Sequence, residues 1–273
     1  MASVETSIDP LTDTDWAEHW RRLVNERESR PGAHGDPRYW DRRAAAFARS
    51  TRARVDQFLE VLAPYCTPRT TLIDVGAGAG RHAVPLSERI EWVTAVEPSE
   101  GMRALIPHRD NMTVVASGWE DAQVAPADLV ICCHVMYGVV EPRPFIEKME
   151  ACARERVFVM IREGAIPHPA EEIRKRIGRS VARMPQFSDL FQLLMQIGIT
   201  PDVMFIRYPT VQRFKDMAEA LEDCHMHLDE PWDEATVRSI LQDVLVKDGD
   251  ELVYDGGQTL SGVAHWRPRT TSS

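Results

Sequence analysis

The chain contains the stretch Thr71-Leu72-Ile73-Asp74-Val75-Gly76-Ala77-Gly78-Ala79-Gly80-Arg81-His82, a short apolar run followed by three alternating glycines. The run is too short for a helix and is typical of a strand buried on both faces of a parallel sheet. Glycine permits dihedrals that a Cβ forbids, and it lets a ligand approach the main chain. The stretch therefore predicts a strand, a tight turn and a helix whose free amides near Gly80 can receive an anion.

The spacing Gly-x-Gly-x-Gly differs from the dinucleotide fingerprint, which needs its third glycine one residue later. Arg81 stands at that position, so the offset disfavours NAD. Residues 92–96 form a second apolar run, which ends in Glu97. A carboxylate there can accept hydrogen bonds from both hydroxyls of a ribose.

Further strand-like runs follow at residues 112–116, 127–133 and 156–162. Strands that alternate with helices at this pitch predict a parallel sheet with its ligand at the carboxyl ends of the strands. The ordered set resembles the class I S-adenosylmethionine-dependent methyltransferases over residues 71–162. The resemblance implies an α/β, Rossmann-like fold with a doubly wound seven-stranded sheet, mostly parallel with an antiparallel edge hairpin, and S-adenosylmethionine as cofactor.

The same resemblance assigns cofactor-binding roles. In the family, the aspartate of the first strand and the glycine loop hold the methionine part of the cofactor. These positions correspond to Asp74, Gly76, Gly78 and Gly80. The acidic residue after the second strand holds the ribose, which corresponds to Glu97.

The adenine is expected beside the segment that contains Pro98 and Met102. The family usually has an aspartate after the third strand, but here that place is Gly118. Trp119 and Glu120 are therefore the expected adenine contacts, with ordinary packing of the Trp119 ring as the alternative.

An aromatic segment before the first strand often closes over the cofactor in this family. Tyr39 and Trp40 are the candidates for this role, and packing on the sheet is the alternative for Trp40. Asp15 is expected to begin an earlier amphipathic helix that buries Trp16 and Trp20 on one face.

The chain is expected to divide into four segments. They are an N-terminal helical cap (1–50), a cofactor-binding core (51–165), a helical substrate lid (166–200) and a C-terminal completion of the sheet (201–273).

Two helix starts and two late strands complete this interpretation. Ser50 or Thr51 is expected to cap the helix before the first strand, and Thr210 to cap a helix after a strand at residues 203–208. The last strand is expected at residues 259–266.

The composition limits the classes of molecule that the protein can be expected to bind. The formal net charge is −10, which argues against a nucleic-acid substrate because such binding depends on clustered Lys and Arg. The basic run at residues 174–183 stands beside Glu171 and Glu172 and is typical of a solvated helix face. We expect no membrane segment, because no run of 18 apolar residues occurs. The N-terminus lacks a signal pattern, which predicts a cytoplasmic protein.

The five cysteines show no paired metal-binding spacing and are expected to be reduced core thiols, so no metal is expected. A metal or arsenic site built from Cys132 with Cys152 or Cys224 is the alternative.

The segment after the fourth strand is expected to lie where the methyl group points. His134 is the candidate general base there, and Tyr137 is expected to orient the substrate or to pack against the methionine part of the cofactor. Arg162 and His168 are candidates to meet an acidic group on the substrate. The alternative for His134 is a structural histidine that hydrogen-bonds to the backbone, and the alternative for Arg162 and His168 is a surface ion pair or a solvated loop.

The predicted function is methyl transfer from S-adenosylmethionine to a small-molecule acceptor by direct in-line displacement. The segment after the fourth strand lacks the Asn/Asp-Pro-Pro-aromatic pattern of the family's nucleic-acid amino-methylating enzymes. The alternatives are an RNA or protein methyltransferase and a cofactor-binding scaffold without turnover.

Overall fold

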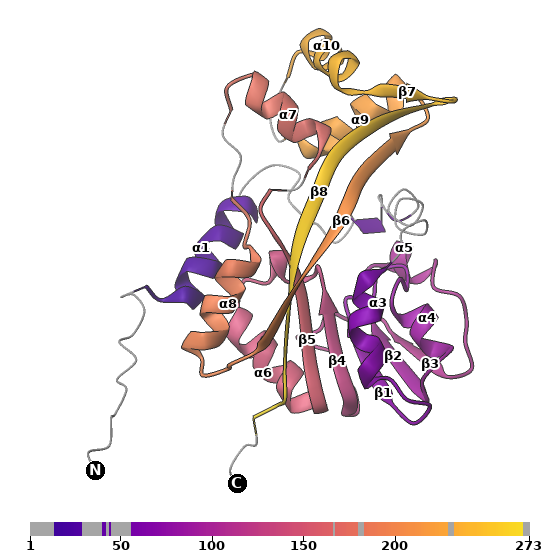
Figure 1. Ribbon diagram of the computed structural model, residues 1–273, viewed down its shortest axis with the longest axis vertical. Helices are drawn as coiled ribbons and strands as arrows, with labels where there is room; N and C mark the ends of the chain where they lie inside the picture. Colours follow the sequence, from indigo (N-terminus) through magenta and orange to yellow (C-terminus); the bar gives the residue numbers. More distant parts are fainter. Residues whose placement is uncertain are drawn as a thin grey trace.

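The structure is a computed structural model (Figure 1), and it describes residues 14–28, 40–41, 44, 56–165, 167–179, 183–228 and 232–269. An eight-stranded sheet runs through this part of the chain, with helices on both of its faces. None of the described helices has the length and apolar composition that crossing a membrane requires.

The strands are β1 Thr71–Val75, β2 Trp92–Val96, β3 Met112–Val115, β4 Ala127–Cys133, β5 Ala153–Glu163, β6 Asp202–Phe214, β7 Val246–Asp248 and β8 Glu251–Trp266. Their order is β3-β2-β1-β4-β5-β8-β6, and β7 pairs with β8 outside this order. Pairing is parallel from β3 to β5 and antiparallel for β8 with β5, β6 and β7. The expected mostly parallel sheet with an antiparallel edge hairpin is confirmed, with β7 as an additional strand.

The helices are α1 Trp16–Glu28, α3 Gln57–Leu62, α4 Ala83–Ser87, α5 Glu100–Arg103, α6 Pro142–Cys152, α7 Pro169–Arg176, α8 Phe187–Gln196, α9 Met217–His227 and α10 Glu234–Val244, with 3-10 turns η1 Ala63–Tyr65 and η2 Met136–Gly138. The side chain of Asp56 caps α3 by accepting a hydrogen bond from the Phe58 amide. The expected caps Ser50 and Thr51 lie outside the described residues.

Strand β1 shows how the sheet separates two hydrophobic cores. Ile73 and Val75 enter the core formed with α1, α6 and α8, whereas Leu72 enters the core formed with α3 and α4. Side chains alternate along a strand, so Asp74 points to the same face as Leu72. The sequence therefore places this carboxylate on the α3 and α4 side of the sheet.

Helix α1 is an integral part of the first core. Asp15 Oδ1 accepts hydrogen bonds from the amides of Ala17 and Glu18 at 3.0 and 3.1 Å, as expected for a helix start. The Trp20 side chain is fully buried, and its Nε1 donates to the carbonyl oxygen of Val139 at 2.9 Å. Helix α1 thus ties the N-terminal segment to the loop that follows β4.

Strands β6 and β8 continue beyond the core sheet as a twisted ribbon (Figure 1). Their extended ends, with β7, α7, α9 and α10, form a third hydrophobic cluster, which we call the ribbon module. The expected helix cap at Thr210 is wrong: Thr210 lies within β6, and its hydroxyl contacts that of Thr259 on β8. Asp216 caps the following helix instead, by accepting from the Glu219 amide at 2.9 Å.

The expected lid at residues 166–200 divides into two parts. Helix α7 packs in the ribbon module, whereas α8 packs against the core sheet and α1. Phe187 of α8 sits directly on Gly262 of β8, where an added Cβ would lie 2.1 Å from the Phe187 ring. In this structure α8 therefore packs as part of the first core, and the role of residues 166–200 as a substrate lid stays a prediction.

Replacing Trp20 tests whether the N-terminal helix is part of the folding unit. Trp20→Ala removes a fully buried ring and its hydrogen bond, so we expect a loss of about 3 to 5 kcal/mol in the free energy of unfolding. Urea unfolding measures it, with Glu18→Ala on the exposed face of α1 as the control. A change in Trp20→Ala no larger than in the control would show that α1 is a detachable cap.

Candidate functional site

The loop after β1 is shaped by three glycines with positive φ. The φ angles of Gly76, Gly78 and Gly80 are 69°, 57° and 80°, a region that L side chains rarely adopt. An added Cβ would lie 2.4 Å from Val135 at Gly76 and 2.8 Å from Val84 at Gly80. At Gly78 a Cβ would meet no described atom within 4 Å, so this glycine borders open space that a ligand can enter.

Asp74 is a buried carboxylate with unused hydrogen-bonding capacity. Only 1% of its surface is exposed, and its Oδ2 has no hydrogen-bond partner among the described residues. Burial raises the pKa of Asp74 to about 6, although His82 and the Ala83 amide oppose this rise. An unpartnered carboxylate oxygen beside a glycine loop fits a cationic ligand group such as an amine.

Glu97 lies at the end of β2 beside the same loop. Its two carboxylate oxygens accept from the amides of Gly78 and Ser99, each at 2.8 Å. Burial raises the pKa of Glu97, and the two amide hydrogen bonds oppose the rise. A carboxylate can accept about four hydrogen bonds, so capacity for two hydroxyl donors remains.

The segment at Trp40 and Asp41 docks on the start of α5. Asp41 Oδ1 accepts from Ser99 Oγ at 2.6 Å and from the Gly101 amide at 2.9 Å. A Cβ at Gly101 would lie 2.9 Å from the Asp41 backbone, so glycine permits this contact. Asp41 thereby lies close enough to Glu97 to raise the pKa of that carboxyl, and Tyr39 lies outside the described residues.

The expected adenine contacts occupy different environments. Met102 is buried in α5, Pro98 is exposed before it, and Glu120 is exposed after β3. Trp119 is 3% exposed, and its Nε1 already donates to the carbonyl oxygen of Phe145 at 3.2 Å. This packing favours the structural interpretation of Trp119.

His134 turns toward the site through a positive φ of 59°, which is uncommon for a residue other than glycine. The Arg162 amide donates to the Tyr137 hydroxyl oxygen at 2.7 Å, and that oxygen lies 2.9 Å from His134 Nδ1. In the tautomer in which the Tyr137 hydroxyl donates to Nδ1, the imidazole proton of His134 lies on Nε2. Burial holds the pKa of His134 well below its usual value, and the charges of Arg162 and Arg81 lower it further.

A small pocket beside His134 contains residues that the sequence did not single out. Its lining is Asp56, Gln57, Phe58, Arg81, His134, Met160, Ile206 and Tyr208. Asp56 binds Arg81 Nε at 2.7 Å and lies 3.1 Å from His82 Nε2. Burial lowers the pKa of His82, but the Cys133 side chain and the carboxylates of Asp56 and Asp74 outweigh this effect and raise the pKa to about 10. Arg81 and His82 directly follow the glycine loop, and this position could have identified them as site residues. Tyr208 lies in an ordinary strand pattern, which does not distinguish it.

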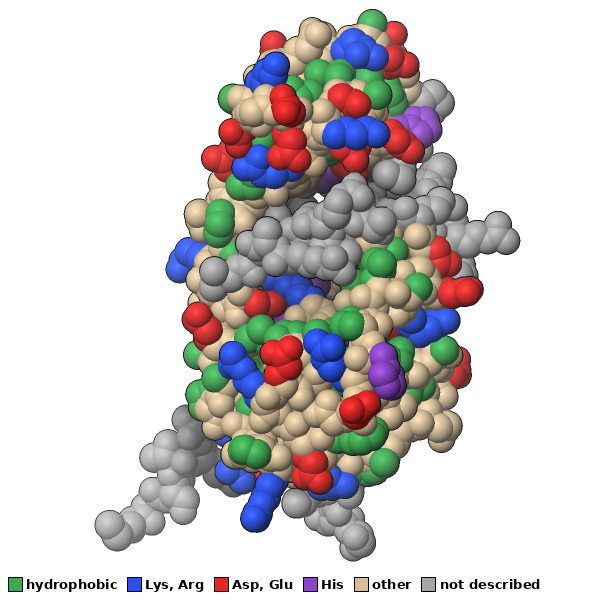
Figure 2. Space-filling model, turned by 90° about the vertical axis from the view of Figure 1, so that its right-hand side faces the viewer, with side chains coloured by type: hydrophobic (Ala, Val, Ile, Leu, Met, Phe, Trp, Pro, Cys, Tyr) green, Lys and Arg blue, Asp and Glu red, His purple; other side chains and the backbone are tan. Residues whose placement is uncertain are grey.

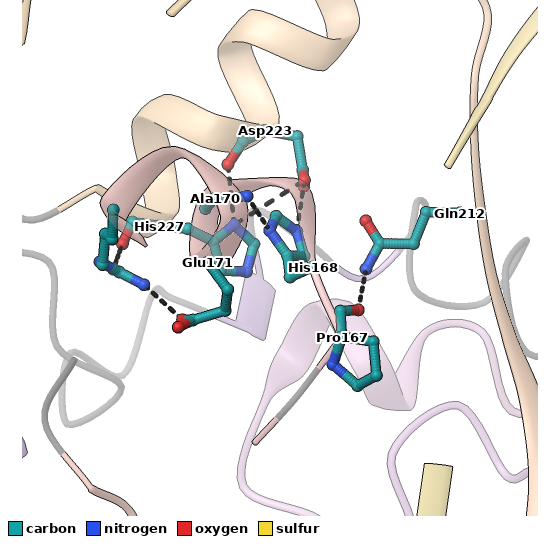
Figure 3. Close-up of polar contacts among 8 residues, drawn as sticks. Pro167, His168, Ala170, Glu171, Gln212, Asp223 and His227 are labelled. Carbon is teal, nitrogen blue, oxygen red and sulfur yellow. Dashed lines mark hydrogen bonds and ion pairs between the residues drawn. The ribbon is translucent and has the colours of Figure 1, made fainter. Parts of the chain in front are cut away.

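A second cluster, missed from the sequence, lies in the ribbon module (Figure 3). His168, Asp223 and His227 have the composition of a metal site, and their ligand atoms lie within 4.8 Å of one another. His168 also lines an adjoining cavity of about 440 Å³.

The hydrogen bonds explain this cluster without a metal. His168 Nδ1 accepts from the Ala170 amide at 3.0 Å, so the proton is on Nε2, which donates to Asp223 at 2.9 Å. His227 Nδ1 donates to the Asp223 carbonyl oxygen at 2.8 Å. A metal would therefore have to displace the proton on His168 Nε2, and the His168 side chain serves as the cap of α7.

The surface charges are mixed. Figure 2 shows acidic and basic side chains interspersed over the ribbon module and the core. In the basic run of α7, Arg174 pairs with Glu171, and Arg176 with Glu172 and Asp243. These two arginines are therefore paired with carboxylates, and the Arg174 side chain is only 13% exposed, which differs from the solvated face that we expected.

Comparison with known proteins supports the same fold. A family described as "Methyltransferase domain" matches residues 47–193, more than half of the chain. An uncharacterized protein of Haemophilus influenzae is 27% identical over 181 residues, which cover 62% of this chain and 66% of that protein.

Two solved structures are similar in fold. A candidate methyltransferase of Bacillus halodurans has a TM-score of 0.50 at 12% identity, and one from an antibiotic biosynthesis pathway of Anabaena variabilis has 0.52 at 14%. Each comparison covers 78% of this chain and 98% of the other. The glycine loop, the two carboxylates beside it and the family match agree: the chain belongs to the class I S-adenosylmethionine-dependent methyltransferases.

Proposed function

We propose that the protein transfers a methyl group from S-adenosylmethionine to a small-molecule acceptor by direct in-line displacement. The observation that carries this proposal is the pairing of a buried, unpartnered oxygen on Asp74 with open space at Gly78. Asp74 would hold the cationic amine of the methionine part, while the amides of the glycine loop and the start of α4 receive its carboxylate. Glu97 would hold the ribose hydroxyls.

The bound cofactor supplies a methyl group on a sulfonium, and the new bond to the acceptor forms as the carbon–sulfur bond breaks. Its electron pair stays on the sulfur. The protein contributes orientation and exclusion of water, and well-oriented reactions gain about 7 to 11 kcal/mol in this way. Val135 packs over Gly76, so the segment that carries His134 and Tyr137 lies directly beside the cofactor loop.

In this proposal His134 positions the acceptor through its Nε2–H. With a proton on Nε2, the imidazole can take up a second proton only on Nδ1. That step would charge the ring, which is unfavourable because the pKa of His134 is held well below its usual value. Service as a general base therefore requires the proton to move to Nδ1, which breaks the hydrogen bond donated by Tyr137. The arrangement favours an acceptor atom that needs no base.

The surface charges favour a small-molecule acceptor over RNA. The net charge is −10, and two arginines of the basic run on α7 are paired with carboxylates. Binding to a polynucleotide backbone needs clustered cations that release counterions. The described surface offers mixed charge instead (Figure 2).

Asp74→Asn is expected to stabilise the protein and weaken cofactor binding. The folded pKa of about 6 exceeds the usual value of 3.8, so protonated Asp74 favours folding and this contribution is lost as the pH rises through about 6. The neutral amide avoids that loss, so above this pH we expect a gain of about 1 to 3 kcal/mol in the free energy of unfolding. Urea unfolding at several pH values and calorimetry with S-adenosylhomocysteine measure the two effects.

Asp128→Asn is the matched control on the neighbouring strand β4. Burial raises the pKa of Asp128, but hydrogen bonds from Thr71 and the charge of Arg154 outweigh it and lower the pKa. Ionised Asp128 therefore favours folding above its usual pKa, and its replacement is expected to destabilise the protein at neutral pH. If both variants lost stability there, Asp74 would be a structural carboxylate.

Glu97→Ala is expected to weaken S-adenosylhomocysteine binding, because each charge-assisted hydrogen bond to a ribose hydroxyl is worth about 1.5 to 3 kcal/mol. Glu97→Gln keeps a hydrogen-bonding side chain and should retain more affinity. Calorimetry on both folded variants measures the difference. Unchanged affinity in folded Glu97→Ala would remove this residue from the cofactor site.

Methyl transfer itself is tested with labelled S-adenosylmethionine. The protein is incubated separately with the RNA, the protein and the low-molecular-mass fraction of a cell extract, and we expect label only in the last. Label in the RNA or the protein fraction would contradict the proposed small-molecule acceptor. Cofactor binding without transfer to any fraction would instead identify a scaffold.

A further inference from the structure

Arg162 is a half-buried cation at the carboxyl end of β5. Its Cζ lies 5.8 Å from the centre of the Tyr137 ring, and the Tyr208 side chain lies beside it. Within the part of the chain that the structure describes, no carboxylate forms an ion pair with its guanidinium. A cation withdrawn from water without a counterion is unfavourable, which indicates that something else supplies the negative charge.

Arg156 provides an internal comparison, because it lies on the same strand and face as Arg162. Its Cζ lies 4.9 Å from the centre of the Tyr65 ring, so it too stacks on a tyrosine. Arg156 Nη1, however, lies 3.3 Å from a carboxylate oxygen of Asp202. The chain thus provides a counterion for one arginine of this pair and leaves the other open.

The surroundings of Arg162 present further hydrogen-bond donors. The Tyr208 hydroxyl lies 3.4 Å from His134 Nε2 and 3.1 Å from Ser261 Oγ. Tyr208 and His134 both line the small pocket, together with the ion pair of Asp56 and Arg81 and the apolar residues Phe58, Met160 and Ile206. The site therefore combines cationic and neutral donors with an apolar wall.

The position of Arg162 separates it from the cofactor loop. Strand β4 lies between β1 and β5, so two strand spacings of about 4.8 Å each separate the two strand ends. The chain order reverses between β1 and β4, the point at which ligands of such sheets bind. Arg162 and the glycine loop lie on opposite sides of this point. An acceptor would approach on the side of Arg162.

We propose that Arg162, with the hydroxyl of Tyr208, binds an oxyanion of the methyl acceptor, so that the acceptor is an acidic small molecule with an apolar body. The oxyanion is a carboxylate or a phosphate, both of which match the fork of a guanidinium. This inference rests on the proposed methyl transfer to a small molecule and specifies its acceptor.

The first experiment separates a low-molecular-mass extract on a quaternary ammonium resin into retained anions and an unretained fraction. Each fraction is assayed for transfer of label from S-adenosylmethionine, and we expect label only with the retained anions. Phosphatase treatment before the assay abolishes transfer if the group is a phosphate and leaves it intact if the group is a carboxylate. Transfer only to unretained compounds overturns the inference but supports methyl transfer, whereas transfer to neither fraction overturns the proposed function.

The second experiment uses the acceptor purified from the retained fraction. Arg162→Gln is expected to raise its KM by roughly 10- to 100-fold, as the loss of charge-assisted hydrogen bonds predicts. Arg162→Lys keeps the charge and should recover part of the affinity. The Kd for S-adenosylhomocysteine should not change in either variant.

Arg156→Gln is the matched control, and we expect it to leave the acceptor KM unchanged. Thermal unfolding confirms that each variant is folded, and Arg162→Gln should keep its melting temperature because it breaks no described ion pair. An equal rise of KM in both glutamine variants would assign Arg162 a structural role. A parallel loss of S-adenosylhomocysteine affinity in Arg162→Gln would place it in the cofactor site, and either result overturns the inference.

Discussion

The site depends on a backbone constraint at the carboxyl ends of β1 and β2. The amides of Gly76 and Ala77 both donate to the carbonyl oxygen of Val96, at 2.8 and 3.0 Å. This double contact bends the chain sharply as it leaves β1, and it requires the positive φ that glycine supplies. Without it, Gly78 would not meet Glu97, and Val135 would not pack over the loop.

The same constraint explains the unusual electrostatics of the site. Folding holds Asp74, Glu97 and Asp56 close together, and burial penalises their charged forms. Asp56 is compensated by Arg81 and His82, so its pKa falls despite burial. Asp74 retains an unpartnered oxygen. The protein thus keeps one carboxylate in an unfavourable state at the place where a cationic ligand is expected.

The sequence was most informative where the local pattern and the fold agree. Alternation in β1 places Ile73 and Leu72 in different cores, and the glycine spacing leaves few other structures for the loop. The start of α1 followed from Asp15 in the same way. These features depend on neighbours in the chain, so composition and spacing are sufficient to predict them.

Features set by distant residues were not predictable in this way. Thr210 has a side chain that can cap a helix, but pairing with Thr259 on β8 keeps it in a strand. The contact between Phe187 of α8 and Gly262 of β8 joins residues that are far apart in the sequence, so no local pattern predicts it. Tyr208 and Asp56 are far apart in the sequence but both line the pocket beside His134, and no local pattern links them.

The continuity of β6 and β8 restricts how the ribbon module can move. Their ladder runs from the pair Asp202 and His265 in the core to the pair Phe214 and Leu252 in the module. A hinge would have to break this ladder, so the softest motion is a change of twist where the register shifts between Pro209 and Val211. Proline lacks an amide hydrogen, which weakens the pairing at this point. The ribbon module should therefore rotate about the strand axis rather than undergo a hinge opening. It should also unfold together with the core in one cooperative transition.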